Sequence, residues 1–136
     1  MKSRLVRCQP IDVVYVEAIG LDQAPAAFKR LEAVVPLKGN KFFATYDQTR
    51  KAYRACARIA DPAKFAAYGL PRATLAGGTY ATTELVGPLA DIVPRIAPAF
   101  EALIARHGFD RSRLPIEFYK RQTQVVLYLP VAVYTN

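Results

Sequence analysis

The sequence predicts an α+β protein built from a duplicated strand–helix–strand–strand module. The same order of strand-like and helix-like segments occurs twice, at an offset of roughly 70 residues. The two predicted first strands also end alike, because Glu17 and Glu84 each stand three residues before a glycine. One such module cannot bury its sheet alone. We therefore expect a single domain over 1–136, with module 1 at about 1–60, a connector at about 61–71 and module 2 at about 72–136.

Module 1 begins with a strand at 11–20, rich in β-branched and aromatic residues and ended by Gly20. Asp22 is the expected helix N-cap, and Pro25 falls in the first turn, where its missing N–H costs little. The apolar face of this helix recurs at helical spacing: Ala24, Phe28, Leu31 and Val35. Two strand-like runs follow at 41–47 and 53–60.

Module 2 repeats this order after a connector of one possible helical turn at 61–68. A long strand covers 72–87, and an apolar helical stripe runs from Pro88 to Gly108. Pro94 and Pro98 lie inside that stripe, so we expect a kink or a short first helix that restarts at Pro94. The last two strands are predicted at the following ranges, joined by a polar turn: 114–121 and 124–134.

Charge and hydropathy exclude several classes of protein. The net charge is +8, from 19 basic and 11 acidic residues, but the basic residues are spread from Lys2 to Arg121 without a stripe on one helix. We therefore expect no direct nucleic-acid binding. No apolar run approaches the roughly 18 residues of a membrane span, and no signal-peptide pattern opens the chain. The expected location is cytoplasmic.

The inventory of reactive side chains is small. Cys8, Cys56 and His107 are the only cysteines and histidine, which cannot form a metal cluster or a disulfide framework. The two serines lie outside any nucleophile elbow, and the paired glycines of "LAGGTYA" lack the Lys-Ser/Thr sequel of a phosphate loop. We expect no metal, no cofactor and two unbridged thiols.

The second half resembles the GyrI-like small-molecule-binding domain, which is also the effector-binding domain of AraC-type and multidrug-responsive regulators. The signposts are a glycine before "YA" in the strand, Gly87 before the helix, Gly108 after it, a Pro-x-Glu-x-Tyr step at Pro115, and a final "LYLPV". The resemblance extends more loosely to the first half through "VVYVEAIG" and "YRACARI". Arg54-Ala55-Cys56 departs from the Arg-aromatic-Asp step common in relatives, and tryptophan is absent.

The resemblance implies two antiparallel sheets with pseudo-twofold symmetry, helices on one side and a ligand groove on the other. It also implies a buried glutamate as counter-charge, which corresponds here to Glu117. Strand alternation places Glu117 and Tyr119 on one face of their strand. Tyr128 and Tyr80 are further candidates for ligand contact. The alternative for Glu117 is a surface ion pair, because Lys120 and Arg121 follow it closely.

Three functions stay open at this point. The first is a stand-alone protein that binds an aromatic, apolar compound, cations included, for sensing, sequestration or detoxification. The second, implied by the resemblance, is a hydrolase of strained, cyclopropane-bearing toxins, with Glu117 as base and Tyr119 or Tyr128 as acid. The third is an interaction protein of the DNA gyrase inhibitor kind. The expected partner is a small aromatic molecule, and the chain is expected to be a monomer or a homodimer.

Overall fold

The structure, a computed structural model, describes residues 1–132 and has the predicted α+β class, with antiparallel pairing between its strands. The chain divides into two compact units. The first-half unit is Ile11–Leu75, and the second-half unit combines Met1–Pro10 with the chain from Ala76 onward. No helix in the described part of the chain is both long and apolar enough to cross a membrane.

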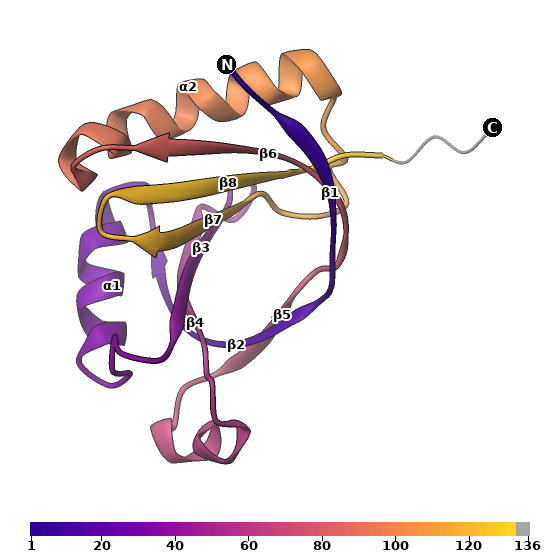
Figure 1. Cartoon of the computed structure of the whole chain (residues 1–136). Coiled ribbons are helices and arrows are strands. Elements are labelled where there is room, and N and C mark those ends of the chain that lie inside the picture. The colour runs from indigo at the N-terminus through magenta and orange to yellow at the C-terminus, as the bar shows by residue number, and fades with distance from the viewer. Residues whose placement is uncertain (133–136) are drawn as a thin grey trace. The chain divides into compact units, whose positions relative to one another are not determined.

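The first-half unit is a four-stranded antiparallel sheet with one α-helix (Figure 1). Its strand order is β3-β4-β2-β5, and its helix contacts β2 and β4 through the fully buried Ala27 and Leu31. The elements are β2 (Ile11–Ile19), α1 (Ala24–Glu32), β3 (Lys41–Asp47), β4 (Ala52–Arg58) and β5 (Arg72–Leu75). Three short 3₁₀ helices complete the unit: Leu21–Gln23, Pro62–Lys64 and Ala66–Tyr68.

The start of α1 differs from the prediction. Asp22 lies inside the 3₁₀ turn Leu21–Gln23, and Gln23 takes the N-cap position, so Asp22 as the cap was wrong. Gly20 causes the difference, because its φ of +95° turns the chain and its carbonyl accepts a hydrogen bond from the Gln23 N–H at 3.1 Å. Pro25 does fall in the first turn.

The second-half unit also contains four strands and one α-helix, and its strand order is β1-β6-β8-β7 (Figure 1). The elements are β1 (Arg4–Cys8), β6 (Gly78–Val86), α2 (Leu89–His107), β7 (Ile116–Arg121) and β8 (Gln124–Pro130). The helix α2 contacts β6 and β8. The last predicted strand reaches 134, but β8 ends at Pro130, and 133–134 lie outside the described residues.

The boundaries of the units follow strand pairing and differ from those predicted for the modules. β1 was not expected as a strand, and it pairs with β6, with Cys8 opposite Gly78. The predicted strand 72–87 is two strands, because β5 pairs with β2 and β6 begins after Gly77. A Cβ at Gly77 would lie 2.8 Å from the Pro10 ring, so this break needs a glycine. The predicted near-twofold relation stays a prediction.

The helix α2 runs unbroken from Leu89 to His107, so the predicted restart at Pro94 is not found. Pro94 and Pro98 both lie on the exposed side of the helix, and so do the carbonyl groups that their missing N–H groups would have bonded. Water can bond those carbonyls. The opposite side of the helix is held by burial of Ile92 and Leu103, which are both 0% exposed.

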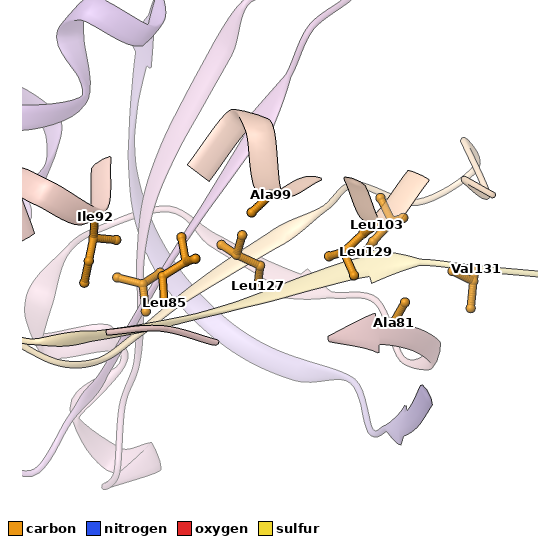
Figure 2. Close-up of a cluster of buried hydrophobic side chains, with 9 residues drawn as sticks. Ala81, Leu85, Ile92, Ala99, Leu103, Leu127, Leu129 and Val131 are labelled. Atoms are coloured by element: carbon orange, nitrogen blue, oxygen red, sulfur yellow. The ribbon is translucent and has the colours of Figure 1, made fainter. Parts of the chain in front are cut away.

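The core of the second-half unit lies between α2 and one face of the sheet (Figure 2). From β8, alternate residues point toward the helix, and Leu127 and Leu129 are fully buried. The cluster comprises Ala81, Leu85, Ile92, Ala99, Leu103, Val125, Leu127, Leu129 and Val131. Its position fixes which face of each strand α2 covers.

Candidate functional site

Glu117 and Tyr119 project from β7 on the face that α2 covers. The β7–β8 ladder places Glu117 opposite Leu127, and it places Tyr119 opposite Val125. Paired residues of an antiparallel ladder project from the same face, and both partners belong to the core cluster under α2. Tyr119 itself packs against that cluster. The strand alternation predicted from the sequence thus gives one shared face for the acid and the phenol.

Tyr128 and Tyr80 lie on the opposite face of the same sheet. Tyr128 pairs with Ile116, which alternates with Glu117 along β7. Tyr80 pairs with Pro130, two residues from Tyr128 along β8. This corrects the expected site: the four residues do not line one groove on the side away from the helices. Within the second-half unit, Glu117 and Tyr119 lie on the face under α2, and Tyr80 and Tyr128 lie on the opposite face.

The acid and the phenol are directly bonded. Tyr119 Oη donates a 2.6 Å hydrogen bond to Glu117 Oε1. Among residues 1–132, no lysine or arginine forms an ion pair with Glu117, so the surface ion pair considered from the sequence is not found. The carboxyl therefore has a neutral partner, and a charge on it is not balanced by a described basic group.

Burial sets the protonation behaviour of this carboxyl. Desolvation raises the pKa of Glu117, and the hydrogen bond from Tyr119 lowers it by less. The two residues are only half-buried overall, so solvent reaches part of each. A carboxylate in this setting gains from any group that restores the lost solvation, either a proton or a cation.

The second pair is built around Tyr80. Its ring meets that of Tyr128 edge-on, with centroids 6.0 Å apart, and its hydroxyl donates to the Ala76 carbonyl oxygen. Tyr80 is fully buried, and burial is the main cause of its raised pKa. Because its ring packs against Tyr128 and its hydroxyl is hydrogen-bonded to the main chain, Tyr80 has a structural role in this structure. Tyr128 is half-buried and keeps an accessible surface.

Sequence reasoning missed Arg113, which contacts Tyr80 of this second pair. Its guanidinium lies 4.9 Å from the centroid of the Tyr80 ring. It also donates hydrogen bonds to the carbonyl oxygens of Thr79 and Val131, at 3.2 and 3.0 Å, and pairs with Asp110 at 3.3 Å. The spacing of Asp110 and Arg113, three residues apart in a loop, was the available signal.

The two cysteines are free thiols that differ in burial. Cys8 and Cys56 are both free, and burial raises the pKa of Cys56 to about 12. A thiol of such a pKa is a poor nucleophile at neutral pH. No group of three or more metal-ligating side chains occurs among the residues that the structure describes.

Among the comparisons with known proteins, only the comparison with solved structures finds matches. No protein-family model matches the sequence. No curated protein matches it either. Among solved structures, SAV2435 bound to tetraphenylphosphonium is 17% identical, with a TM-score of 0.68 over 97% of this chain and 94% of that one. The chain has the GyrI-like fold.

Two further solved structures are similar to this chain in fold. The integron cassette protein VCH_CASS2 from the mobile metagenome of Vibrio cholerae is 14% identical, with a TM-score of 0.71 over 96% of this chain and 95% of that one. A hydrolase from Listeria innocua is 13% identical, with a TM-score of 0.63 over 96% of this chain and 92% of that one. At these identities the likeness concerns the fold, and the GyrI-like resemblance noted in the sequence is confirmed at that level.

Proposed function

We propose that this protein binds a small aromatic, apolar compound, cations included, at the Glu117–Tyr119 pair. The observation that carries the proposal is the state of the Glu117 carboxyl. It is desolvated, bonded to a phenol at 2.6 Å, and without a basic partner among the described residues. Burying such a carboxyl costs free energy, and carboxyls whose pKa is raised by burial are found preferentially at functional sites.

The surroundings of the pair suit an aromatic compound. Tyr119 packs against the buried apolar cluster, and Phe100 and Ile96 of α2 pack against the same cluster. Aromatic rings and cations are bound well by phenol and phenyl faces. SAV2435, which shares the fold, has a solved structure bound to the aromatic cation tetraphenylphosphonium. Sensing, sequestration and detoxification are all compatible with such binding.

Titration with tetraphenylphosphonium tests the proposal. Wild type is compared with Glu117→Gln, which keeps the side-chain volume and removes the charge. The matched control is Glu101→Gln, an exposed glutamate of α2. We expect Glu117→Gln to weaken binding by about 1.5 to 3 kcal/mol, which is roughly ten- to hundredfold, and the control to bind like wild type. Equal affinity in all three proteins contradicts the assignment of Glu117.

Hydrolysis of a strained electrophile is the second candidate, favoured by the hydrogen bond between an acid and a phenol. Glu117 would take a proton from the attacking water while the water oxygen forms a bond to a cyclopropane carbon. Tyr119 would give its proton to the carbon released by ring opening, and proton transfer from Glu117 would restore the phenol. The Listeria innocua hydrolase shares the fold.

A turnover assay separates the two candidates. For hydrolysis, Glu117→Gln should reduce turnover of a cyclopropane-bearing compound by about 10² or more, while binding of the intact compound changes much less. For binding alone, no turnover is seen in wild type. Unchanged binding and unchanged turnover in Glu117→Gln would instead favour the third alternative, a gyrase inhibitor-like interaction protein that acts through another surface.

A further inference from the structure

A row of three polar side chains crosses the second-half sheet on the face opposite α2. The β1–β6 ladder pairs Arg4 with Thr82, and the β6–β8 ladder pairs Thr82 with Tyr128. Residues paired in this way project from one face of the sheet. Neighbouring strands lie about 4.8 Å apart, so the long side chains of Arg4 and Tyr128 flank the short side chain of Thr82 closely. Strand pairing thus brings together a guanidinium, a hydroxyl and a phenol.

These three polar groups have no described hydrogen-bond or ion-pair partner. Thr82 is 6% exposed, and its Oγ1 is the one buried side-chain nitrogen or oxygen of residues 1–132 that makes no hydrogen bond. The next hydroxyl along β6, that of Thr83, donates a 2.7 Å bond to the Lys2 carbonyl oxygen. Arg4 is exposed and belongs to none of the described ion pairs. An unpaired buried hydroxyl costs free energy and calls for an explanation.

The charges on this face favour a ligand with a single negative charge. Burial raises the pKa of Tyr128, and the positive charge of Arg4 opposes that rise by less, so the phenol keeps its proton at neutral pH. Glu84 is the exposed acid on the same face of β6, where it accepts a 2.9 Å bond from Gln124. It forms no described ion pair with Arg4. One guanidinium near an acid suits a monoanion better than a dianion.

The other described neighbours of the row are apolar or aromatic. Ile116 pairs with Tyr128 on its far side and is 7% exposed. The next pair along β1 and β6 is Val6 and Tyr80, and the Tyr80 ring meets the Tyr128 ring at 6.0 Å. Tyr128 is half-buried, so part of its ring is accessible. Aromatic side chains of this kind pack well against another ring.

We propose that Arg4, Thr82 and Tyr128 form a second binding site, which takes the carboxylate of a small aromatic acid. The planar fork of an arginine matches a carboxylate, and the two hydroxyls supply further donors to its oxygens. Because Thr82 Oγ1 is closed to solvent, a flanking side chain must move before a ligand reaches it. Arg4 can move without breaking a described polar contact. The site lies on the sheet face opposite Glu117, so it goes beyond the proposed function and does not depend on it.

NMR titration of the ¹⁵N-labelled protein with benzoate tests this site, because amide shifts report both affinity and location. We expect the shifts to centre on Arg4, Thr82 and Tyr128. Arg4→Gln should weaken benzoate binding roughly ten- to hundredfold. The matched control is Arg7→Gln, an exposed arginine of the same strand on the other face, which removes the same charge and should bind like wild type. Benzamide and acetate should both bind more weakly than benzoate.

A second pair of variants tests the buried hydroxyl. Thr82→Val keeps the side-chain shape and should weaken benzoate binding by about three- to tenfold. Because the Thr82 hydroxyl is unpaired, its removal should not lower the Tm. Thr83→Val removes a hydroxyl that is bonded to the main chain, so it should lower the Tm while leaving benzoate binding unchanged.

Each contrary outcome overturns a stated part of the proposal. Absence of benzoate binding by folded wild type, as judged by circular dichroism, overturns the site. Equal effects of Arg4→Gln and Arg7→Gln show attraction by general charge and also overturn it. Equal affinity for inorganic phosphate overturns the carboxylate, and equal affinity for acetate overturns the aromatic ring. A Thr82→Val protein that binds benzoate like wild type removes Thr82 from the site. Benzoate binding lost in Glu117→Gln contradicts the independence of the two sites, whereas the proposed function is tested separately by tetraphenylphosphonium.

Discussion

Glu117 lies directly opposite Leu127 in the β7–β8 ladder, on the face that α2 covers. Because Leu127 is fully buried, this register places an ionisable group at the margin of a hydrophobic core. The desolvated carboxyl and its hydrogen bond to Tyr119 follow from that position. The first two predictions concern this pair.

The first prediction is that Glu117→Gln gains stability over wild type as the pH rises. The pKa of Glu117 is raised in the folded state, so its protonated form favours folding below the pKa of the unfolded chain. That contribution is lost as the pH rises through the folded-state pKa, and the glutamine has no corresponding loss. Thermal unfolding should show a difference in Tm between the variant and wild type that grows from about pH 4 to about pH 8. A constant difference, or the same trend in Glu101→Gln, contradicts it.

The second prediction is that Tyr119→Phe raises the pKa of Glu117 further. The 2.6 Å hydrogen bond stabilises the charged carboxylate, and phenylalanine keeps the ring while removing the donor. We also expect a loss of about 1 to 3 kcal/mol in the free energy of unfolding where Glu117 is ionised, with a smaller loss at acid pH. Carbon-13 NMR titration of the Glu117 carboxyl and urea unfolding measure the two effects. An unchanged pKa would mean that the hydrogen bond does not persist in solution.

The third prediction concerns the core beneath α2. Leu103→Ala removes a fully buried side chain of the cluster and should cost about 2 to 5 kcal/mol, from lost burial and the cavity left behind. Val93 lies on the same helix with 55% of its surface exposed, so Val93→Ala should change stability by about 0.5 kcal/mol or less. Chemical denaturation measures both. Similar losses would show that α2 does not bury the predicted face.

The fourth prediction concerns Arg113. Arg113→Lys keeps the charge but loses the planar fork that reaches the carbonyl oxygens of Thr79 and Val131. We expect a loss of about 1 to 3 kcal/mol, because those carbonyls lose a charged donor and the Tyr80 ring loses its cover. Arg121→Lys, on an exposed strand end, is the matched control and should be neutral. Equal stability of the two variants contradicts a clamp at Arg113.

The fifth prediction concerns the thiols. Cys56 is 1% exposed and its pKa is raised to about 12, so it should react with iodoacetamide far more slowly than the half-buried Cys8 in the folded protein at about pH 8. Mass spectrometry under native and unfolding conditions compares the two. Both residues should be alkylated without a reducing agent once the chain is unfolded. A Cys56 that reacts as fast as Cys8 would contradict its burial.

The elements of the fold were largely determined by local pattern. Alternation and helical spacing predicted β2, α1, β3 and β4 in the correct order, and β6, α2, β7 and β8 after them. The strand β1 was missed, because "RLVRC" is mostly exposed and has no clear alternation; its pairing with β6 makes it a strand. The prolines of α2 were overestimated as breaks, because their exposure leaves the affected carbonyl groups to water.

The candidate site divides in the same way. The sequence alone determined that Glu117 and Tyr119 share a face, since neighbouring strand residues alternate. Only the tertiary structure decided which face it is, through the register with β8 and the packing of α2. The same register placed Tyr80 and Tyr128 on the other face. Alternation is a local property of one strand, whereas the choice of face depends on contacts between segments distant in the chain, which no local pattern encodes.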